Sequence, residues 1–173
     1  YDVRVMLPKY MCMKDEWKEK LQYHTHFYMD LNWRKQYVGV LEMEYDGIKF
    51  YFIDNEYYFN GYAPYGDMYA DIEKFAFFSK AVLSALPLID FRPDIIHCHD
   101  WQTGLVPVYL DNFRYGNEFY RGIKTVMTIH NLKFQGTWDP KRVRDITGLP
   151  QYYFAPDKLE AYKDANYLKG GIV

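Results

Sequence analysis

A strand, a helix and a second strand follow one another in the middle of this chain, and this order limits the possible folds. Residues 95–98 form a short apolar run, residues 103–114 have helical spacing, and residues 125–129 form a second apolar run. Strand–helix–strand units of this length build parallel sheets, because the crossover helix returns the chain to the same end of the sheet. The sequence therefore predicts an α/β fold, with a mainly parallel sheet of buried strands and helices on both of its faces.

A β-hairpin is predicted before this unit, over residues 37–54. Two β-rich runs flank Asp46-Gly47, a pair that favours the type I′ turn because both residues tolerate positive φ. Residues 1–7 are predicted to form a further strand, which Pro8 ends.

A helix is predicted over residues 71–89 and a loop over residues 9–36. The helical stretch carries one apolar stripe, made of Phe75, Phe78, Val82, Leu83 and Leu86. Pro87 should strain or end this helix, because proline lacks the amide hydrogen. Residues 9–36 are mixed and charged without a sustained period, which predicts a loop with at most a short helical turn. After residue 129 short helical pieces lead to NYLKGGIV, which is also predicted to be helical.

Composition limits the classes of ligand and the compartment. The chain has 173 residues, which suits one domain, and its 21 basic and 23 acidic side chains form no basic cluster of the kind that nucleic-acid binding needs. No apolar run approaches the roughly 20 residues of a membrane span and no signal peptide opens the chain, so no membrane association is predicted. Cys12 and Cys98 form no CxxC pair, which favours a reducing, cytoplasmic location. Aromatic residues make up 20% of the chain, a content that favours core packing, with carbohydrate contact as the alternative.

Polar side chains follow both apolar strands of the central unit. His97, His99 and Asp100 stand at the end of the first strand, and His130 and Asn131 at the end of the second. Ligands of open α/β sheets bind in the crevice beyond the carboxyl ends of the strands. The two groups are therefore predicted to face one crevice from neighbouring strand ends.

Structural roles are the alternatives for these residues. His97 lies inside the strand, which favours a hydrogen-bonded histidine of the core. Asp100 is a good N-cap residue and can serve the helix that follows. His130 stands between an apolar strand and a loop that contains glycine, and this position favours a functional role.

No metal site and no cofactor are predicted. His97, His99 and His130 could surround a zinc ion only in principle, because no Cys or Glu ligand stands at a useful spacing. The pair His24 and His26 has no third partner and is interpreted as part of a solvated loop. The sequence also contains neither a Walker-type glycine loop nor a GxGxxG motif.

Several stretches form a series along nearly the whole chain: YDVRVMLPKY, WRKQYVGVLEMEYDGIKFYFIDNEYYF, FAFFSKAVL, PDIIHCHDWQTGLVPVYL, TIHNLKFQG and NYLKGGI. This series resembles bacterial glycogen synthase and plant starch synthase, and it fits the bacterial enzymes better because no transit peptide or arm is visible. The resemblance implies one half of a retaining glycosyltransferase that has two Rossmann-like domains. Such an enzyme moves glucose from ADP-glucose to the 4-hydroxyl at the non-reducing end of an α-1,4-glucan. The implied partners are thus the ADP-glucose donor and the α-glucan acceptor.

The resemblance also implies roles for individual residues. His130 matches the histidine beside the donor sugar, and Asp100 lies in the HDW segment that lines the cleft, so these two are the implied catalytic residues. The implied substrate-binding residues are His99, Trp101, Gln102, Asn131 and Gln135. The transition state of glucosyl transfer is oxocarbenium-like, and His130 is expected to position the sugar and form hydrogen bonds rather than act as a general base.

By the same resemblance, residues 1–173 correspond to a partial N-terminal, acceptor-side catalytic domain. The family's first strand, with its Lys-x-Gly-Gly loop, and its C-terminal nucleotide-binding domain fall outside these residues, which predicts a fragment that is inactive alone and can self-associate. Lys74 stands where the family commonly has arginine and receives no substrate contact. Lys163 stands at a frequent glycine position, which leaves the role of Asn166 open.

Two alternatives have the same fold. One is a catalytically silent glucan-binding or regulatory module, and the other is a related glycosyltransferase that uses another nucleotide-sugar donor.

Overall fold

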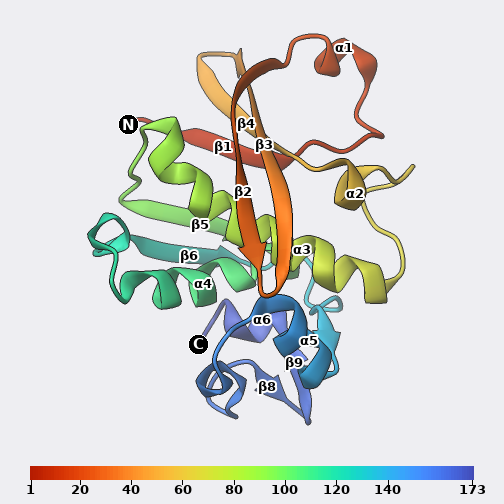
Figure 1. Cartoon of the computed structure of the whole chain (residues 1–173), viewed down its shortest axis with the longest axis vertical. Coiled ribbons are helices and arrows are strands. Elements are labelled where there is room, and N and C mark those ends of the chain that lie inside the picture. The colour runs from red at the N-terminus through yellow and green to blue at the C-terminus, as the bar shows by residue number, and fades with distance from the viewer.

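The computed structural model describes residues 1–173, and its largest sheet contains four strands. These are β1 (Arg4–Pro8), β2 (Gln22–Leu31), β3 (Arg34–Tyr45) and β4 (Ile48–Asp54), arranged in the order β1-β4-β3-β2 (Figure 1). β1 is parallel to β4, whereas the β2–β3 and β3–β4 pairs are antiparallel. The strand predicted at the start of the chain and both strands of the predicted hairpin are therefore confirmed.

The turn between β3 and β4 has the predicted geometry. Asp46 has a φ of 51° and Gly47 a φ of 74°, so both central residues are left-handed, as a type I′ turn requires. Tyr45 pairs directly with Ile48, which leaves two residues in the loop and fixes the register of the hairpin.

The loop predicted for residues 9–36 is wrong, because β2 occupies much of it. Only the short helix α1 (Asp15–Lys18) matches the expected helical turn. Strand β2 buries Met29 and Leu31 while its other face carries exposed tyrosines such as Tyr28, so a period of two is present but both faces contain apolar or aromatic residues. A register shift between Tyr23 and Thr25 interrupts the period further.

The long helix α3 (Met68–Ala85) follows the short helix α2 (Glu56–Phe59) and packs against β2 and β4. The Asp67 side chain caps it by accepting a hydrogen bond from the Ala70 amide at 3.1 Å. After Ala85 the chain continues as the 3₁₀ helix η1 (Leu86–Ile89), which contains Pro87. The predicted helix is confirmed, and its whole apolar stripe is buried, comprising Phe75, Phe78, Val82, Leu83 and Leu86.

The predicted strand–helix–strand unit is present as β5 (Ile95–His99), α4 (Leu105–Arg114) and β6 (Lys124–Thr128), with β5 and β6 parallel. The 3₁₀ turns η2 (Trp101–Thr103) and η3 (Glu118–Tyr120) lie on either side of α4.

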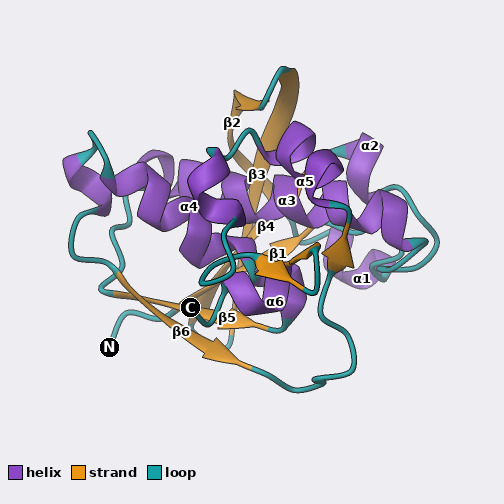
Figure 2. Cartoon of the chain, turned by 90° about the horizontal axis from the view of Figure 1, so that it is seen from below, coloured by secondary structure: helices purple, strands orange, loops and turns teal.

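Figure 2 shows α3 and α4 on one side of the β5–β6 pair. On that side Cys98 is only 2% exposed, whereas Ile95 and Val126 on the other side are 58% and 47% exposed. The predicted α/β class is confirmed, and within residues 1–173 helices α3 and α4 cover one face of this strand pair.

The last forty or so residues form a small subdomain beside α3 and α4 (Figure 1). Its helices are α5 (Pro140–Thr147), the 3₁₀ turn η4 (Gln151–Phe154) and α6 (Tyr167–Gly170), the last of which confirms the helix predicted for NYLKGGIV. Its strands are β7 (Thr137–Trp138), β8 (Glu160–Ala161) and β9 (Asp164–Asn166), in the order β7-β9-β8. Between β8 and β9, Lys163 has a φ of 73°, a backbone conformation that glycine adopts most readily.

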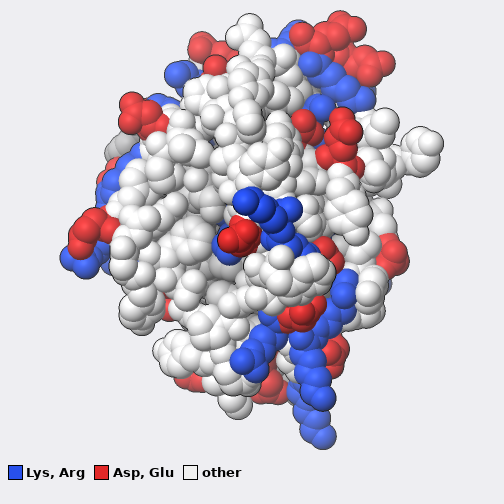
Figure 3. Space-filling view, viewed as in Figure 1, with Lys and Arg blue, Asp and Glu red and all other residues white.

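Charged residues of both signs are interspersed on the face shown in Figure 3, without an extended basic patch. The cysteines are both free, with Cys12 exposed and Cys98 buried. None of the helices is both long enough and apolar enough to cross a membrane.

Gly104 connects the central unit to the C-terminal subdomain by a close backbone approach. A Cβ atom at residue 104 would lie 2.1 Å from the carbonyl oxygen of Tyr167. We expect Gly104→Ala to lower the free energy of unfolding by about 1–3 kcal/mol, because backbone has to move to relieve this contact. Gly66→Ala is the matched control, since the nearest atom there, Asp71 Oδ1, is 3.8 Å away. Thermal unfolding of both variants beside the parent chain measures the difference, and equal stabilities would contradict the expectation.

Candidate functional site

The carboxyl ends of β5 and β6 bring the predicted site residues together. His99 pairs with Thr128 in the parallel ladder, so the residues that follow each strand leave the sheet side by side. His99 Nδ1 lies 3.1 Å from His130 Nε2, and the two rings stack with their centroids 5.3 Å apart. The prediction that both histidines stand at adjacent strand ends is confirmed.

Asp100 joins the two strand ends through its carboxylate. Its Oδ1 accepts hydrogen bonds from the backbone amides of His130, at 2.7 Å, and Asn131, at 3.2 Å. Its own amide donates to the carbonyl of Thr128 at 3.0 Å. The Asp100 side chain makes no capping bond to η2, so the alternative role as an N-cap is wrong. We call this arrangement the Asp100 clamp.

The backbone of Asp100 is in an unusual conformation, with φ 58° and ψ −175°. This region is populated almost only by glycine, and a residue held there costs on the order of 1–3 kcal/mol. The hydrogen bonds of the Asp100 clamp compensate for part of that cost, because they hold residue 100 between the two strand ends. A strained residue at a strand end is typical of a functional site.

The imidazoles of His97, His99 and His130 form a row on the uncovered face of β5 and β6. His97 is exposed and its Nε2 lies 2.7 Å from Thr128 Oγ1, so the expected hydrogen bond exists but the predicted core position is wrong. Burial lowers the pKa of His99, the neighbouring His97 and His130 lower it further, and Asp100 opposes them. His99 is therefore neutral at pH 7, with one ring nitrogen that donates and one that accepts. The structure contains no group of three or more His, Cys, Asp or Glu side chains arranged to hold a metal ion.

Trp101 lies in the core beneath the loop that follows β6. Its side chain is only 4% exposed and meets the ring of Phe75 edge to face, with centroids 5.1 Å apart. Gly136 closes over it so tightly that a Cβ there would lie 2.3 Å from the indole. Trp101 therefore packs beneath the loop and supports it, and its role in substrate binding stays a prediction.

The Gln135 side chain forms hydrogen bonds at both of its polar atoms. Its Nε2 donates to the Leu132 carbonyl at 3.1 Å, and its Oε1 accepts a hydrogen bond from Asn166 Nδ2 at 2.7 Å. Asn166 Oδ1 accepts in turn from the Lys169 amide at 2.9 Å and caps α6. Asn166 thus ties residues 132–136 to the C-terminal subdomain, a role that the sequence analysis left open.

Three further side chains, those of Asn131, Gln102 and Lys74, differ in their exposure and contacts. The Asn131 side chain is exposed, with its Oδ1 accepting from the Lys133 amide at 3.0 Å and its Nδ2 pointing to no protein acceptor. The Gln102 side chain is half-buried and makes no hydrogen bond, although its carbonyl accepts from Ser79 Oγ at 3.4 Å. Lys74 is buried in an ion pair with Asp71 at 2.9 Å.

Chemically, the strand ends form an open surface that can hold a polar ligand. His130 and Asn131 are exposed and carry donors and acceptors, while Asp100, Trp101 and Gln135 fix the backbone that presents them. Such a preorganised set of hydrogen-bonding groups suits recognition of hydroxyl groups and of charge that develops in a transition state.

The Asp100 clamp is expected to protect the backbone amides of His130 and Asn131 from hydrogen exchange. In Asp100→Ala both amides lose an acceptor that carries a charge, an interaction worth about 1.5–3 kcal/mol. We expect hydrogen exchange at the His130 and Asn131 amides to accelerate by about tenfold, which corresponds to about 1.4 kcal/mol. Asp100→Asn keeps an oxygen acceptor and should show a smaller change. Unchanged exchange in Asp100→Ala would show that the loop holds its shape without the clamp.

Comparison with known proteins identifies a family for this chain. The family described as starch synthase catalytic domain matches residues 1–173. The chain is 71% identical over all of its 173 residues to a glycogen synthase of Lachnoclostridium phytofermentans, and 69% identical over the same length to one of Lachnospira eligens. It spans 36% of the length of each of these relatives.

A solved structure has the same fold. The catalytic domain of starch synthase IV from Arabidopsis thaliana, bound to ADP and acarbose, superposes with a TM-score of 0.80 at 26% sequence identity. The match covers 99% of this chain and 36% of that one. The chain therefore belongs to the starch synthase catalytic domain family.

Proposed function

We propose that this chain forms the acceptor-side wall of a retaining glucosyltransferase, which transfers glucose from ADP-glucose to the 4-hydroxyl at the non-reducing end of an α-1,4-glucan. Relatives named glycogen synthase at 71% and 69% identity support this assignment, and so does the starch synthase neighbour bound to ADP and acarbose. The observation that carries it is the Asp100 clamp, which holds His130 and Asn131 at the strand ends where this fold class binds ligands.

In this proposal His130 and Asn131 contact the donor sugar, while Asp100 acts as a positioning residue through their backbone. Positive charge develops near C1 in the oxocarbenium-like transition state, so groups fixed beforehand around the sugar lower the barrier. His99, whose pKa is lowered, presents a neutral imidazole to His130 and orients it through the 3.1 Å contact. No step requires a metal ion or an organic cofactor.

The rest of the catalytic cleft is assigned to residues outside the 173 described. Since the chain spans 36% of its relatives' length, the diphosphate of the donor is assigned to sequence beyond these residues. β1 and β5 are edge strands of separate sheets, and each is available to pair with a further strand. The proposed cytoplasmic location rests on the cysteine content alone.

A chimaera tests the function without reference to any other part of the natural protein. In this chimaera, residues 1–173 replace the matched segment of the Lachnoclostridium phytofermentans glycogen synthase, to which they are 71% identical. We expect it to release ADP from ADP-glucose when glycogen is supplied, at a rate within about tenfold of the relative's own, because such similar segments preserve the packing between elements. A folded chimaera that releases no ADP would contradict the proposal and favour a catalytically silent glucan-binding module.

The same chimaera does not decide the natural donor, since the other half of its cleft comes from the relative. The alternative of another nucleotide sugar is separated by assaying the complete natural protein with ADP-glucose and UDP-glucose side by side.

A further inference from the structure

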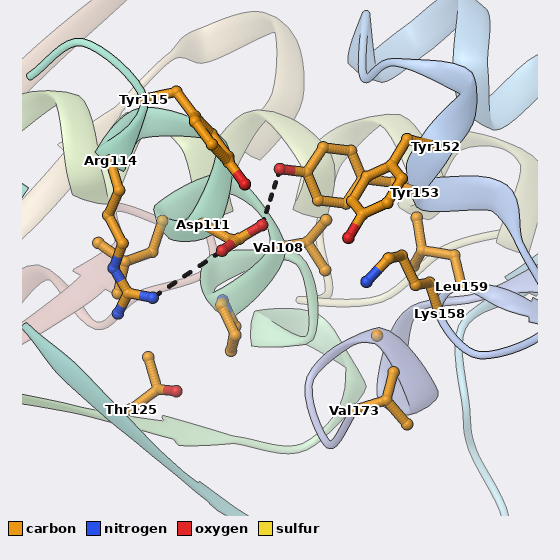
Figure 4. Close-up of a pocket in the computed structure, with 13 residues that line it drawn as sticks. Val108, Asp111, Arg114, Tyr115, Thr125, Tyr152, Tyr153, Lys158, Leu159 and Val173 are labelled. Atoms are coloured by element: carbon orange, nitrogen blue, oxygen red, sulfur yellow. Dashed lines mark hydrogen bonds and ion pairs between the residues drawn. The ribbon is translucent and has the colours of Figure 1, made fainter.

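A buried ion pair lies near the start of α3. Lys74 Nζ is 2.9 Å from Asp71 Oδ1, and the two side chains are only 11% and 4% exposed. On α4, Asp111 and Arg114 form a pair at the same spacing, but they lie 4.0 Å apart and are 44% and 36% exposed (Figure 4). The Asp71–Lys74 pair therefore differs from the solvated ion pairs that are common on helix surfaces.

The buried pair makes its further hydrogen bonds outside the helix. Charges that leave water recover the lost hydration only when the pair is well placed and its remaining donors and acceptors are satisfied. The carboxylate of Asp71 accepts from the Gly66 amide, at 3.2 Å to Oδ1 and 3.0 Å to Oδ2. Lys74 Nζ donates to the carbonyl of Pro64 at 3.3 Å. The pair thus holds the segment before α3, residues 61–66, which we call the 61–66 loop.

The backbone of the 61–66 loop has no other fixed partner. Within the 173 residues it forms no backbone–backbone hydrogen bond, and its contacts to Asp71 and Lys74 are the only hydrogen bonds that it makes. Figure 1 shows the segment running from α2 to the start of α3 without regular structure. Because an unpaired backbone can adopt many conformations, the shape of this loop depends on the buried pair.

The 61–66 loop is a neighbour of the strand-end site. The Tyr65 ring packs against Phe75 with the centroids 6.1 Å apart, and Phe75 meets Trp101 at 5.1 Å. Trp101 in turn lies beneath the loop that follows β6, since a Cβ at Gly136 would be 2.3 Å from the indole. The two loops therefore rest on one aromatic support, with the 61–66 loop on the α3 side.

We propose that Asp71 and Lys74 are positioning residues, which hold the 61–66 loop in one conformation as the α3-side wall of the strand-end site. This inference rests on the proposed function, because it concerns the donor sugar that His130 contacts. A loop that is ordered in advance does not have to be ordered when the sugar binds, so the donor binds more tightly. The pair acts through the backbone of the loop and touches no substrate itself.

The test replaces the pair in the chimaera by apolar side chains of similar size, as Asp71→Leu with Lys74→Met. Such replacements of a buried pair are often neutral for stability, so the midpoint of thermal unfolding should stay within about 5 °C of the parent. The Gly66 amide loses its acceptor, and its hydrogen exchange, resolved by mass spectrometry, should accelerate about tenfold. The KM for ADP-glucose should rise about fivefold, while kcat stays within about twofold.

Two further variants separate the role of the pair from a general effect of charge. Asp15→Asn is the matched control, because Asp15 and Lys18 form a pair of the same two residue types at the same spacing on α1, 3.5 Å apart and with Asp15 89% exposed. Its KM should stay within about twofold. Lys74→Arg keeps the charge and a donor for the Pro64 carbonyl, so its KM should lie within about threefold of the parent.

Unchanged exchange at Gly66 in the double variant would overturn the inference, and so would faster exchange with an unchanged KM or an equal rise of KM in Asp15→Asn. If the double variant does not fold, Asp71→Asn decides, since it keeps the size of the side chain and should shift exchange and KM in the same direction. A chimaera without any ADP release would refute the proposed function instead, and the exchange of the Gly66 amide would still show whether the pair holds the loop.

Discussion

Replacement of His130 by alanine is expected to lower the kcat of the chimaera by about two to three orders of magnitude, or about 2.7–4 kcal/mol in the barrier. The side chain is exposed at the end of β6 and takes no part in the buried core, so its loss should leave the fold intact. It is held in place by the Asp100 clamp and by the contact to His99, and such preorganised groups act mainly on the transition state. Initial rates of ADP release, measured with saturating ADP-glucose and glycogen, give the change in kcat.

His26→Ala provides the matched control for this prediction. His26 is also an exposed histidine, so its replacement removes the same side chain. It lies on β2, outside the strand-end site. Its kcat should remain within about twofold of the parent, and both variants should unfold at nearly the parent temperature. Nearly normal turnover in His130→Ala, or a variant that simply fails to fold, would return His130 to a structural role.

The 173-residue chain by itself is expected to release no ADP above background when it is mixed with ADP-glucose and glycogen. Holding two substrates in register supplies about 7–11 kcal/mol of a barrier reduction, and one wall of a cleft cannot provide it. The strand-end residues His130 and Asn131 are exposed, so water also weakens every charge interaction that would stabilise the leaving diphosphate. Sustained release of ADP by the purified chain would show that the chemistry needs less protein than the proposal assigns to it.

The same preparation tests for self-association. β1 and β5 each have a free edge, and the uncovered face of the β5–β6 pair exposes Ile95 and Val126. Unpaired strand edges and exposed apolar side chains favour association with other chains. Light scattering after size-exclusion chromatography should therefore find oligomers or aggregates, and a monodisperse monomer over the accessible concentrations would contradict this expectation.

Much of the fold could be predicted because local signals agree with tertiary structure. Asp46-Gly47 has a turn preference that the flanking strands can use directly, and the apolar stripe of α3 is buried as its period indicates. Strand β2 could not be predicted in the same way, because its register shift and its exposed tyrosines hide the period.

For the site, the positions of the residues could be predicted from the sequence, but their contacts could not. The strand ends could be predicted because parallel neighbours place His99 and His130 at one edge. The partner of Asp100 could not, since aspartate before a helix is a good cap and only the positive φ of residue 100 turns its carboxylate toward the other strand. The burial of Trp101 could not be predicted either, because the sequence does not show on which side of a 3₁₀ turn a side chain lies. In the structure the Trp101 ring faces Phe75 in the core.

The central claim is that the sugar of the donor or acceptor is held at the ends of β5 and β6. A crystal structure of the chimaera with ADP and acarbose, the two ligands of the Arabidopsis neighbour, tests it most directly. The account predicts a sugar ring within hydrogen-bond reach of the His130 side chain, at about 2.6–3.2 Å, with the Asp100 clamp unchanged. Acarbose bound in the cleft with no contact to the loop that contains His130 and Asn131 would contradict it.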